Sequence, residues 1–166
     1  MKKIHIVGRK NNGKTTLLEE LTQELSTRGL KVGTIKHTGH VHEVDAEGKD
    51  SWRHRKAGGN PAGFVTAGGV GVFFERSEES SPYDLLEPVY QGCDIVLVEG
   101  DRDGEGLKIE VWRKENGDAP LAAEGIKVAA LVTDDEISID LPVWPRSNIK
   151  SIADRVLELA NPKKDL

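Results

Sequence analysis

The chain has 166 residues, 37% of them hydrophobic and 31% charged, with a formal net charge of −5. This balance predicts one folded domain over residues 1–166, excludes a disordered chain and argues against nucleic acid as a partner. No apolar run approaches the roughly 20 residues that a bilayer crossing needs. Since the single cysteine, Cys93, cannot form an internal disulfide, we expect a cytoplasmic protein without a membrane anchor.

The first elements in chain order predict a βαβ unit. Residues 4–7 form an apolar run that ends at Gly8, as a buried parallel strand does. Leucines recur at helical spacing over 17–25, and Gly29 is a typical residue for the end of that helix. Residues 31–35 predict a second strand, so the two strands are expected to be parallel and joined by a right-handed crossover.

The rest of the chain adds strands and helices around a long polar loop at 37–49. The predicted helices are 51–57, 82–91 and 149–159, the last beginning at Asn148, and the predicted strands are 62–67, 70–74, 94–98, 107–113, 128–132 and 142–143. Gly68-Gly69 is the expected hairpin turn, and residues 161–166 are expected to fray. The order predicts a three-layer α/β fold with a mostly parallel central sheet and an additional β-hairpin region.

Residues 8–15, GRKNNGKT, match the phosphate-binding pattern G-x-x-x-x-G-K-[ST]. Gly8 and Gly13 permit backbone conformations that turn N–H groups toward an anion, and the positive end of the following helix dipole adds to that site. Lys14 is expected to reach the β- and γ-phosphates and Thr15 to coordinate Mg²⁺, with Thr16 near the α-phosphate. The strand before the pattern and the helix after it identify a P-loop NTPase fold.

Three carboxylates are candidates for further roles in this site. Glu99 ends the apolar run 94–98, where P-loop proteins place the Walker-B acid beside the metal; the alternative is an ordinary strand end. Asp45, in the polar loop, is a candidate for holding a magnesium-bound water, or is a plain loop acid. Asp134 follows another apolar strand and is a candidate for bonding a guanine base, or is an ordinary strand-end acid. No N-K-x-D motif occurs, so these motifs leave guanine and adenine equally open.

A series of short motifs follows the P-loop in order. They are Lys36-His37, Asp45, Gly48-Lys49-Asp50-Ser51, Leu97-Val98-Glu99-Gly100 and Lys108-Ile109-Glu110. In this order the chain resembles the MobB family of molybdopterin-guanine dinucleotide biosynthesis proteins. The resemblance implies a homodimeric, magnesium-dependent GTP-binding protein with weak GTPase activity. Such a protein assists the guanylyltransferase MobA in adding GMP to molybdopterin during molybdenum cofactor maturation, and is not itself the transferase.

The list of nucleotide-site candidates has further members. These are Asn11 and Asn12 of the P-loop, Lys36 and His37 at the end of the second strand, and Lys49 and Arg53 near the 51–57 helix. The basic residues of that helix are candidates for neutralising a phosphorylated pterin, or else form a solvated helix face. Arg9, Lys10, Asn11 and Asn12 stand where the family more often has small residues, which predicts a more basic rim for the loop.

Two other functions fit parts of the sequence. A small-molecule kinase uses the same P-loop, with Arg53 and Arg55 as lid arginines. A metallochaperone GTPase would use His37, His40 and His42 as metal ligands, although we favour a polar switch loop in which these histidines meet phosphate or solvent.

Overall fold

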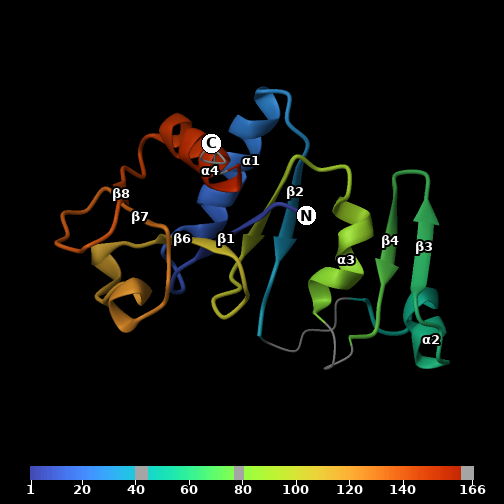
Figure 1. The fold of residues 1–166 in the computed structure, drawn as a ribbon. Helices are drawn as coiled ribbons and strands as arrows, with labels where there is room; N and C mark the ends of the chain where they lie inside the picture. The colour runs from blue at the N-terminus through green and yellow to red at the C-terminus, as the bar shows by residue number, and fades with distance from the viewer. Residues whose placement is uncertain (40–44, 77–80, 162–166) are drawn as a thin grey trace. The chain divides into compact units, whose positions relative to one another are not determined.

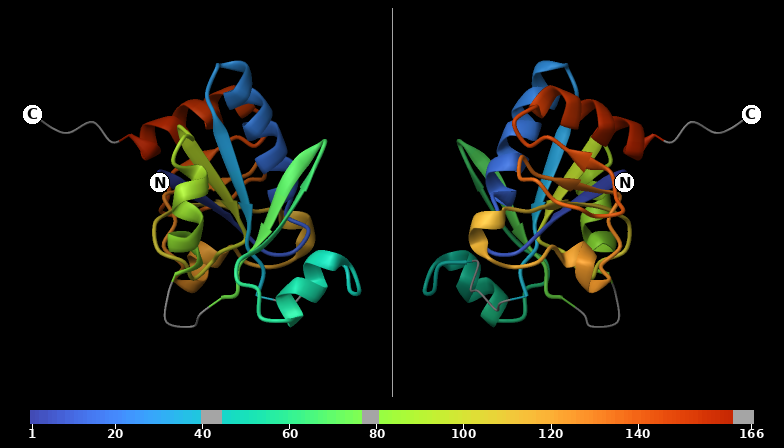
Figure 2. Two further views of the ribbon diagram at one scale, coloured as in Figure 1. Left: turned by 90° about the vertical axis from the view of Figure 1, so that its right-hand side faces the viewer. Right: turned by 90° about the vertical axis from the view of Figure 1, so that its left-hand side faces the viewer.

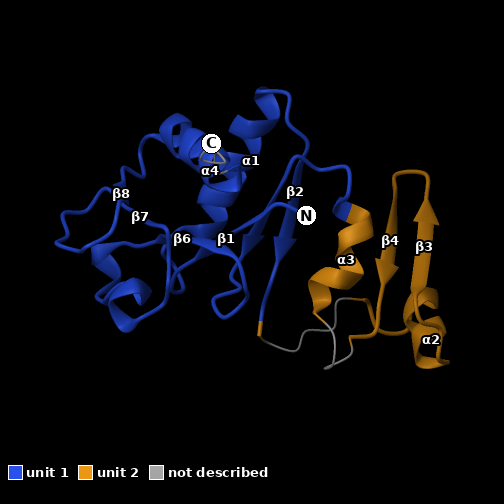
Figure 3. Cartoon of the chain, in the orientation of Figure 1, with its two compact units in different colours: residues 1–38, 90–166 blue, residues 39–89 orange. Residues whose placement is uncertain are grey.

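The computed structural model describes residues 1–39, 45–76 and 81–161, which belong to two compact units. The first unit comprises residues 1–38 and 90–166, and the second comprises residues 39–89 (Figure 3). The positions of the two units relative to one another are not determined. The single-domain organisation therefore stays a prediction, and most of the predicted tail lies outside the described residues.

The first unit contains a six-stranded sheet in the order β2-β5-β1-β6-β7-β8 (Figure 1). Its strands are β1 (Lys3–Val7), β2 (Val32–Lys36), β5 (Ile95–Glu99), β6 (Leu107–Val111), β7 (Ala130–Val132) and β8 (Val143–Trp144). All five neighbouring pairs are parallel. The α/β fold with a parallel sheet is thus confirmed.

Two helices cover one face of this sheet, α1 (Lys14–Thr27) and α4 (Ile149–Ala160). They lie side by side in all three views (Figures 1 and 2). Leu17, Leu21 and Leu25 recur every four residues along α1 and are fully buried in a core shared with β1, β5 and β6. The leucine repeat in the sequence is therefore the buried stripe that binds α1 to the sheet.

The ends of these helices follow from local chemistry. Gly29 has φ +84° after α1, and the Leu30 N–H donates to the Leu25 carbonyl at 3.2 Å, which closes the helix with a left-handed residue that suits glycine. At the start of α4, the Asn148 side chain accepts a hydrogen bond from the Ser151 N–H at 3.1 Å, as its place before the helix predicts.

The opposite face of the sheet is buried as well. Val7, Val96 and Val98 on this face are almost fully excluded from solvent, and so are His5 and Glu110. Burial on both faces explains why the strands read as continuous apolar runs. It also makes the buried His5 and Glu110 unusual, since a buried polar side chain must find its partners within the protein. Trp112 and Trp144 are buried as well.

The carboxyl ends of the strands meet at one edge of the sheet, where open α/β folds bind their ligands. The chain leaves β1 for β2 on one side, and later crosses from β5 past β1 to β6 on the other. The P-loop, which follows β1, lies where the strand order changes direction. This topology places the ends of β1, β5 and β6 beside one another and fixes the candidate site.

The second unit contains helix α2 (Asp50–Lys56) and an antiparallel hairpin of β3 (Ala62–Thr66) and β4 (Gly69–Phe73). The hairpin is confirmed, but Gly69 pairs with Thr66 in the ladder. The two-residue turn is therefore Ala67-Gly68, one position before the predicted one. Helix α3 (Pro82–Tyr90), with Pro88 inside it, begins in this unit.

Candidate functional site: a P-loop at the carboxyl edge of the sheet

The P-loop adopts the backbone conformation that its glycines predict. Gly8 has φ +143°, Gly13 has φ +86°, and Asn11 has φ +67° between them. A Cβ atom at Gly8 would lie 2.4 Å from the backbone oxygen of Val111, so no other residue fits there without displacing β6. Helix α1 begins directly after the loop, and Leu17 N–H donates to the Gly13 carbonyl at 2.9 Å. The first N–H groups of α1 are thereby left for an anion, as at other helix N-termini.

Lys14 is held over the loop. Its Nζ donates to the Arg9 carbonyl at 2.7 Å, which closes the loop around the lysine side chain. Burial lowers the pKa of Lys14, the Glu99 carboxylate opposes that shift, and Lys36 adds to it. A partly desolvated ammonium group is a strong partner for a phosphate, because less water must be removed when the two meet.

Glu99 and Thr15 meet beside the loop, as the sequence predicts. The Thr15 hydroxyl donates to Oε1 of Glu99 at 2.9 Å, and Lys36 Nζ forms an ion pair with the same oxygen. The Glu99 carboxylate is almost fully buried, so it depends on these two partners. A hydroxyl and a carboxylate side by side at a P-loop are oxygen ligands of the kind that Mg²⁺ prefers, and phosphates and water complete such a set. The residues present therefore fit the ion.

A second carboxylate, Asp101, lies two residues beyond Glu99 and faces two histidines. Its Oδ2 is 3.8 Å from Nδ1 of His5, and its Oδ1 is 3.7 Å from Nδ1 of His37. The His37 N–H also donates to the Glu99 carbonyl at 2.8 Å, which places His37 at the edge of the site. Burial lowers the pKa of His5, with Asp101 opposing the shift. Sequence reasoning missed His5 and Asp101; a polar residue inside the first apolar run was the available signal.

A cavity of about 240 Å³ lies at the ends of β6 and β7. Its lining comprises Val111, Trp112, Arg113, Glu115, Thr133, Asp134, Asp135 and Arg146. Asp134, the predicted base-binding residue, is in this lining, and its Oδ1 accepts two hydrogen bonds from Ser147, each 3.0 Å long. A Cβ atom at Gly13 would lie 3.1 Å from Nη2 of Arg113, so the cavity borders the P-loop. The sequence did not single out Arg113 or Arg146.

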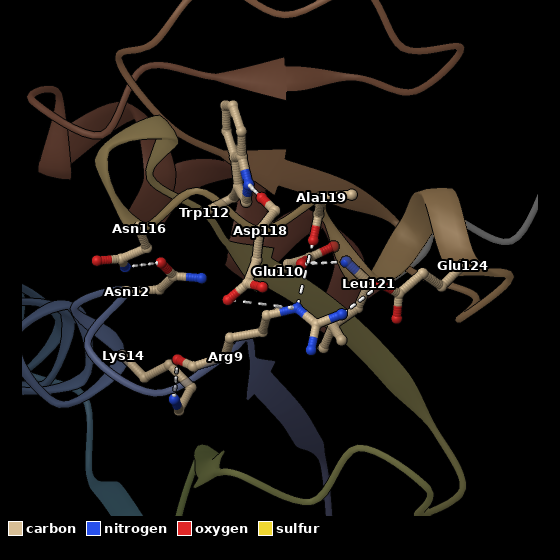
Figure 4. Close-up of polar contacts among 10 residues, drawn as sticks. All are labelled: Arg9, Asn12, Lys14, Glu110, Trp112, Asn116, Asp118, Ala119, Leu121 and Glu124. Atoms are coloured by element: carbon tan, nitrogen blue, oxygen red, sulfur yellow. Dashed lines mark hydrogen bonds and ion pairs between the residues drawn. The ribbon is translucent and has the colours of Figure 1, made fainter.

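The side chain of Arg9 does not extend over the rim of the loop. It forms an ion pair with Glu124 and donates from Nε to the Ala119 carbonyl at 3.4 Å (Figure 4). The predicted basic rim is therefore not formed by Arg9, because acidic residues more than a hundred positions away engage its charge. Thr16 lies in the first turn of α1 and is exposed.

Asp45, Lys49 and Arg53 lie in the second unit. Asp45 is buried, accepts a hydrogen bond from the Ser51 hydroxyl at 3.0 Å, and lies 3.8 Å from a guanidinium nitrogen of Arg55. Lys49 precedes α2, and Arg53 is exposed on it. The approach of these residues to the P-loop stays a prediction.

His40 and His42 lie outside the described residues. Within the described ranges, no group of three or more His, Cys, Asp or Glu side chains is arranged to hold a metal ion. Within the same ranges, no helix combines the length and the apolar character needed to cross a membrane.

Comparisons with known proteins agree on one family. The family model described as "MobB: Molybdopterin guanine dinucleotide synthesis protein B" matches residues 3–134. The chain is 36% identical over 151 residues to a molybdopterin-guanine dinucleotide biosynthesis adapter protein of Haemophilus influenzae, covering 90% of this chain and 84% of the relative. The adapter protein of Escherichia coli is 32% identical over 151 residues, covering 88% and 86%. The crystal structure of Bacillus subtilis MobB aligns with a TM-score of 0.72 at 24% identity, covering 97% and 99%, which shows a shared fold.

Proposed function

Because this chain belongs to the MobB family of molybdopterin-guanine dinucleotide synthesis proteins, we propose that it is an adapter that binds GTP and Mg²⁺ at its P-loop and hydrolyses GTP slowly. The observation that carries the proposal is the meeting of Thr15 and Glu99 beside a P-loop whose lysine is partly desolvated. Packing alone does not require a buried carboxylate beside a hydroxyl and an ammonium group that lie at the start of a helix.

The residues of the first unit divide the work of holding a triphosphate. The amides of the loop and of the first turn of α1 bind phosphate oxygens, and Lys14 neutralises the β- and γ-phosphates. Thr15 and Glu99 are the residues that would hold Mg²⁺, which when bound neutralises charge that develops on the phosphates. Lys36 competes with the metal for Glu99, because its ammonium group already pairs with the carboxylate. Asp45 remains our candidate for a magnesium-bound water.

Guanine is the base that we propose for the cavity beside the P-loop. Asp134 supplies a carboxylate able to accept from N1–H and the N2 amine of guanine, which adenine lacks. Trp112, Arg113 and Arg146 provide an aromatic ring and two guanidinium planes in the same cavity. The position of the cavity supports this proposal, because Arg113 belongs to its lining and also lies beside Gly13 of the P-loop.

The partners follow from the family and from the second unit. We propose that the protein acts with the guanylyltransferase MobA and with molybdopterin, whose phosphate Lys49, Arg53 and Arg55 would neutralise. We also propose a homodimer. The hairpin supports this, because Val65 and Val70 are 78% and 71% exposed, and an isolated two-stranded hairpin is marginally stable in water.

Calorimetric titration with GTP, GDP and ATP in the presence of Mg²⁺ tests the nucleotide proposal. Wild-type protein should prefer GTP, and Lys14→Ala should weaken binding about 10- to 100-fold, since a charge-assisted contact contributes about 1.5–3 kcal/mol. Lys10→Ala is the matched control, because Lys10 is an exposed lysine of the same loop. Equal affinities of wild type and Lys14→Ala would refute the phosphate assignment.

Two further readouts separate this function from its alternatives. Release of inorganic phosphate from GTP without any acceptor supports a slow GTPase and opposes a small-molecule kinase. Co-purification of the chain with the guanylyltransferase, strengthened by GTP, supports the adapter role; purified components that never associate would contradict it.

A further inference from the structure

The segment of residues 112–124 contacts the P-loop at several points and is here called the bracing segment. It contains two short 3-10 helices, η1 (Lys114–Asn116) and η2 (Leu121–Glu124). Glu124 of η2 pairs with Arg9, and Asn116 of η1 donates to the side-chain oxygen of Asn12 (Figure 4). Arg9 and Asn12, two of the four loop residues that stand where the family more often has small side chains, thus reach this segment.

The bracing segment is itself fixed to the sheet by a buried carboxylate. Glu110, at the end of β6, is fully excluded from solvent. Its two oxygens accept hydrogen bonds from the N–H groups of Leu121 and Ala122, at 2.6 and 2.9 Å. Trp112 adds a second attachment, because its backbone N–H donates to the Val132 carbonyl of β7 at 3.1 Å, and its Nε1 donates within the segment to the Asp118 carbonyl at 2.8 Å. A segment held in this way is a rigid support rather than a free loop.

The same segment also lines the cavity that borders the P-loop. Trp112, Arg113 and Glu115 belong to the lining, while Asn116, the next residue, contacts the loop. A displacement of η1 would therefore move the wall of the cavity and release the support of the loop together.

From these contacts we propose that Asn116 and Glu124 are positioning residues for nucleotide binding, which act through Asn12 and Arg9 to hold the P-loop in its phosphate-binding conformation. The inference rests on the proposed GTP site. Arg9 is in this view a structural cation and not a phosphate ligand, since its guanidinium group is surrounded by partners of the bracing segment. These partners are the Glu124 carboxylate, the Ala119 carbonyl and, at 4.0 Å, the Asp118 carboxylate.

Asn116 is the more sensitive of the two positions. The Asn12 side chain is 1% exposed, and among the described residues its Nδ2 has no hydrogen-bond partner. Among the described residues, the Asn12 side chain therefore depends on the hydrogen bond that its Oδ1 accepts from Asn116. Removing it leaves a buried amide without compensation, which is costlier than losing a contact at the surface.

Calorimetric titration of GTP into Asn116→Ala and Glu124→Gln tests the proposal. We expect about ten-fold weaker binding for Asn116→Ala, from the loss of a buried partner. For Glu124→Gln we expect a loss of up to about five-fold, since the pair with Arg9 is partly exposed. Glu158→Gln, an exposed glutamate of α4, is the matched control and should bind like wild type. Circular dichroism melting of each variant checks that the fold is kept.

An exchange of charges separates support from direct phosphate binding. Arg9→Glu alone should weaken GTP binding, and Arg9→Glu combined with Glu124→Arg should recover part of the affinity by restoring the pair. If Arg9 bound phosphate directly, the double variant would bind no better than the single one, and the proposal would be overturned. Wild-type protein that binds no GTP would instead refute the proposed function, whereas wild-type binding with all variants unaffected refutes only the positioning role.

Discussion

Replacement of Gly8 by alanine tests how the P-loop is joined to the sheet. The new Cβ would lie 2.4 Å from the backbone oxygen of Val111, closer than nonbonded atoms approach, and φ at Gly8 is +143°. Val111 cannot yield easily, because β6 is paired with β1 on one side and with β7 on the other. Either the loop or the strand must therefore move.

The expected cost has two parts. A backbone conformation that only glycine adopts readily costs an alanine about 1–3 kcal/mol, and overpacking against a fixed neighbour costs about 1–3 kcal/mol more. Together, Gly8→Ala should lower the free energy of unfolding by about 2–6 kcal/mol. This is a large share of the roughly 5–15 kcal/mol that holds a typical domain together. Phosphate binding should fall as well, since the displaced loop no longer directs its amides inward.

Urea unfolding followed by tryptophan fluorescence measures the effect. Trp112 and Trp144 lie in the first unit, and a Trp52→Phe background removes the signal of the second. Gly29→Ala is the control, because Gly29 also has positive φ but a Cβ atom there would meet nothing within 4 Å. If Gly8→Ala loses no more stability than Gly29→Ala, the close approach of β1 and β6 does not constrain the loop and the reasoning is wrong.

Three further predictions follow from single contacts. Glu99→Gln should leave GTP binding intact but weaken Mg²⁺ binding about 10- to 100-fold, which would raise the Mg²⁺ concentration needed for phosphate release. An unchanged Mg²⁺ requirement would mean that Glu99 ends the strand but takes no part in holding the ion. Because burial lowers the pKa of His5 below 6.5, its stabilising contribution is present above that pH and is lost as the pH falls through the folded-state pKa. Between about pH 7.5 and about pH 5.5, the urea midpoint of unfolding should consequently fall more steeply in wild type than in His5→Gln. Parallel curves for the two proteins would show that His5 does not cause the pH dependence of stability. Val70→Lys should shift the molar mass in light scattering from dimer toward monomer, and an unshifted dimer would place the interface elsewhere.

The sequence by itself was enough to predict the main helices and strands and the central residues of the candidate site. Hydrophobic periodicity is a local property of the sequence, so the leucines of α1 and the apolar run of β1 could be predicted as a helix and a strand without tertiary information. The P-loop pattern and the carboxylate after β5 could be combined because parallel strands bring their carboxyl ends to one edge, and Thr15 and Glu99 do meet there. The hairpin turn was misplaced by one residue because adjacent glycines allow either register.

Only the tertiary structure decided what the unusual side chains do. The sequence predicts a basic rim that includes Arg9, but the partner of Arg9, Glu124, lies 115 positions away, and no local pattern links the two. The cap that Glu110 provides for η2 and the approach of Asp101 to His5 likewise depend on how separate loops fold over one sheet edge. The pairings of the buried groups, Glu110 and His5, arise because an unpaired polar group is costly in the low dielectric of a packed interior, wherever its partner stands in the chain.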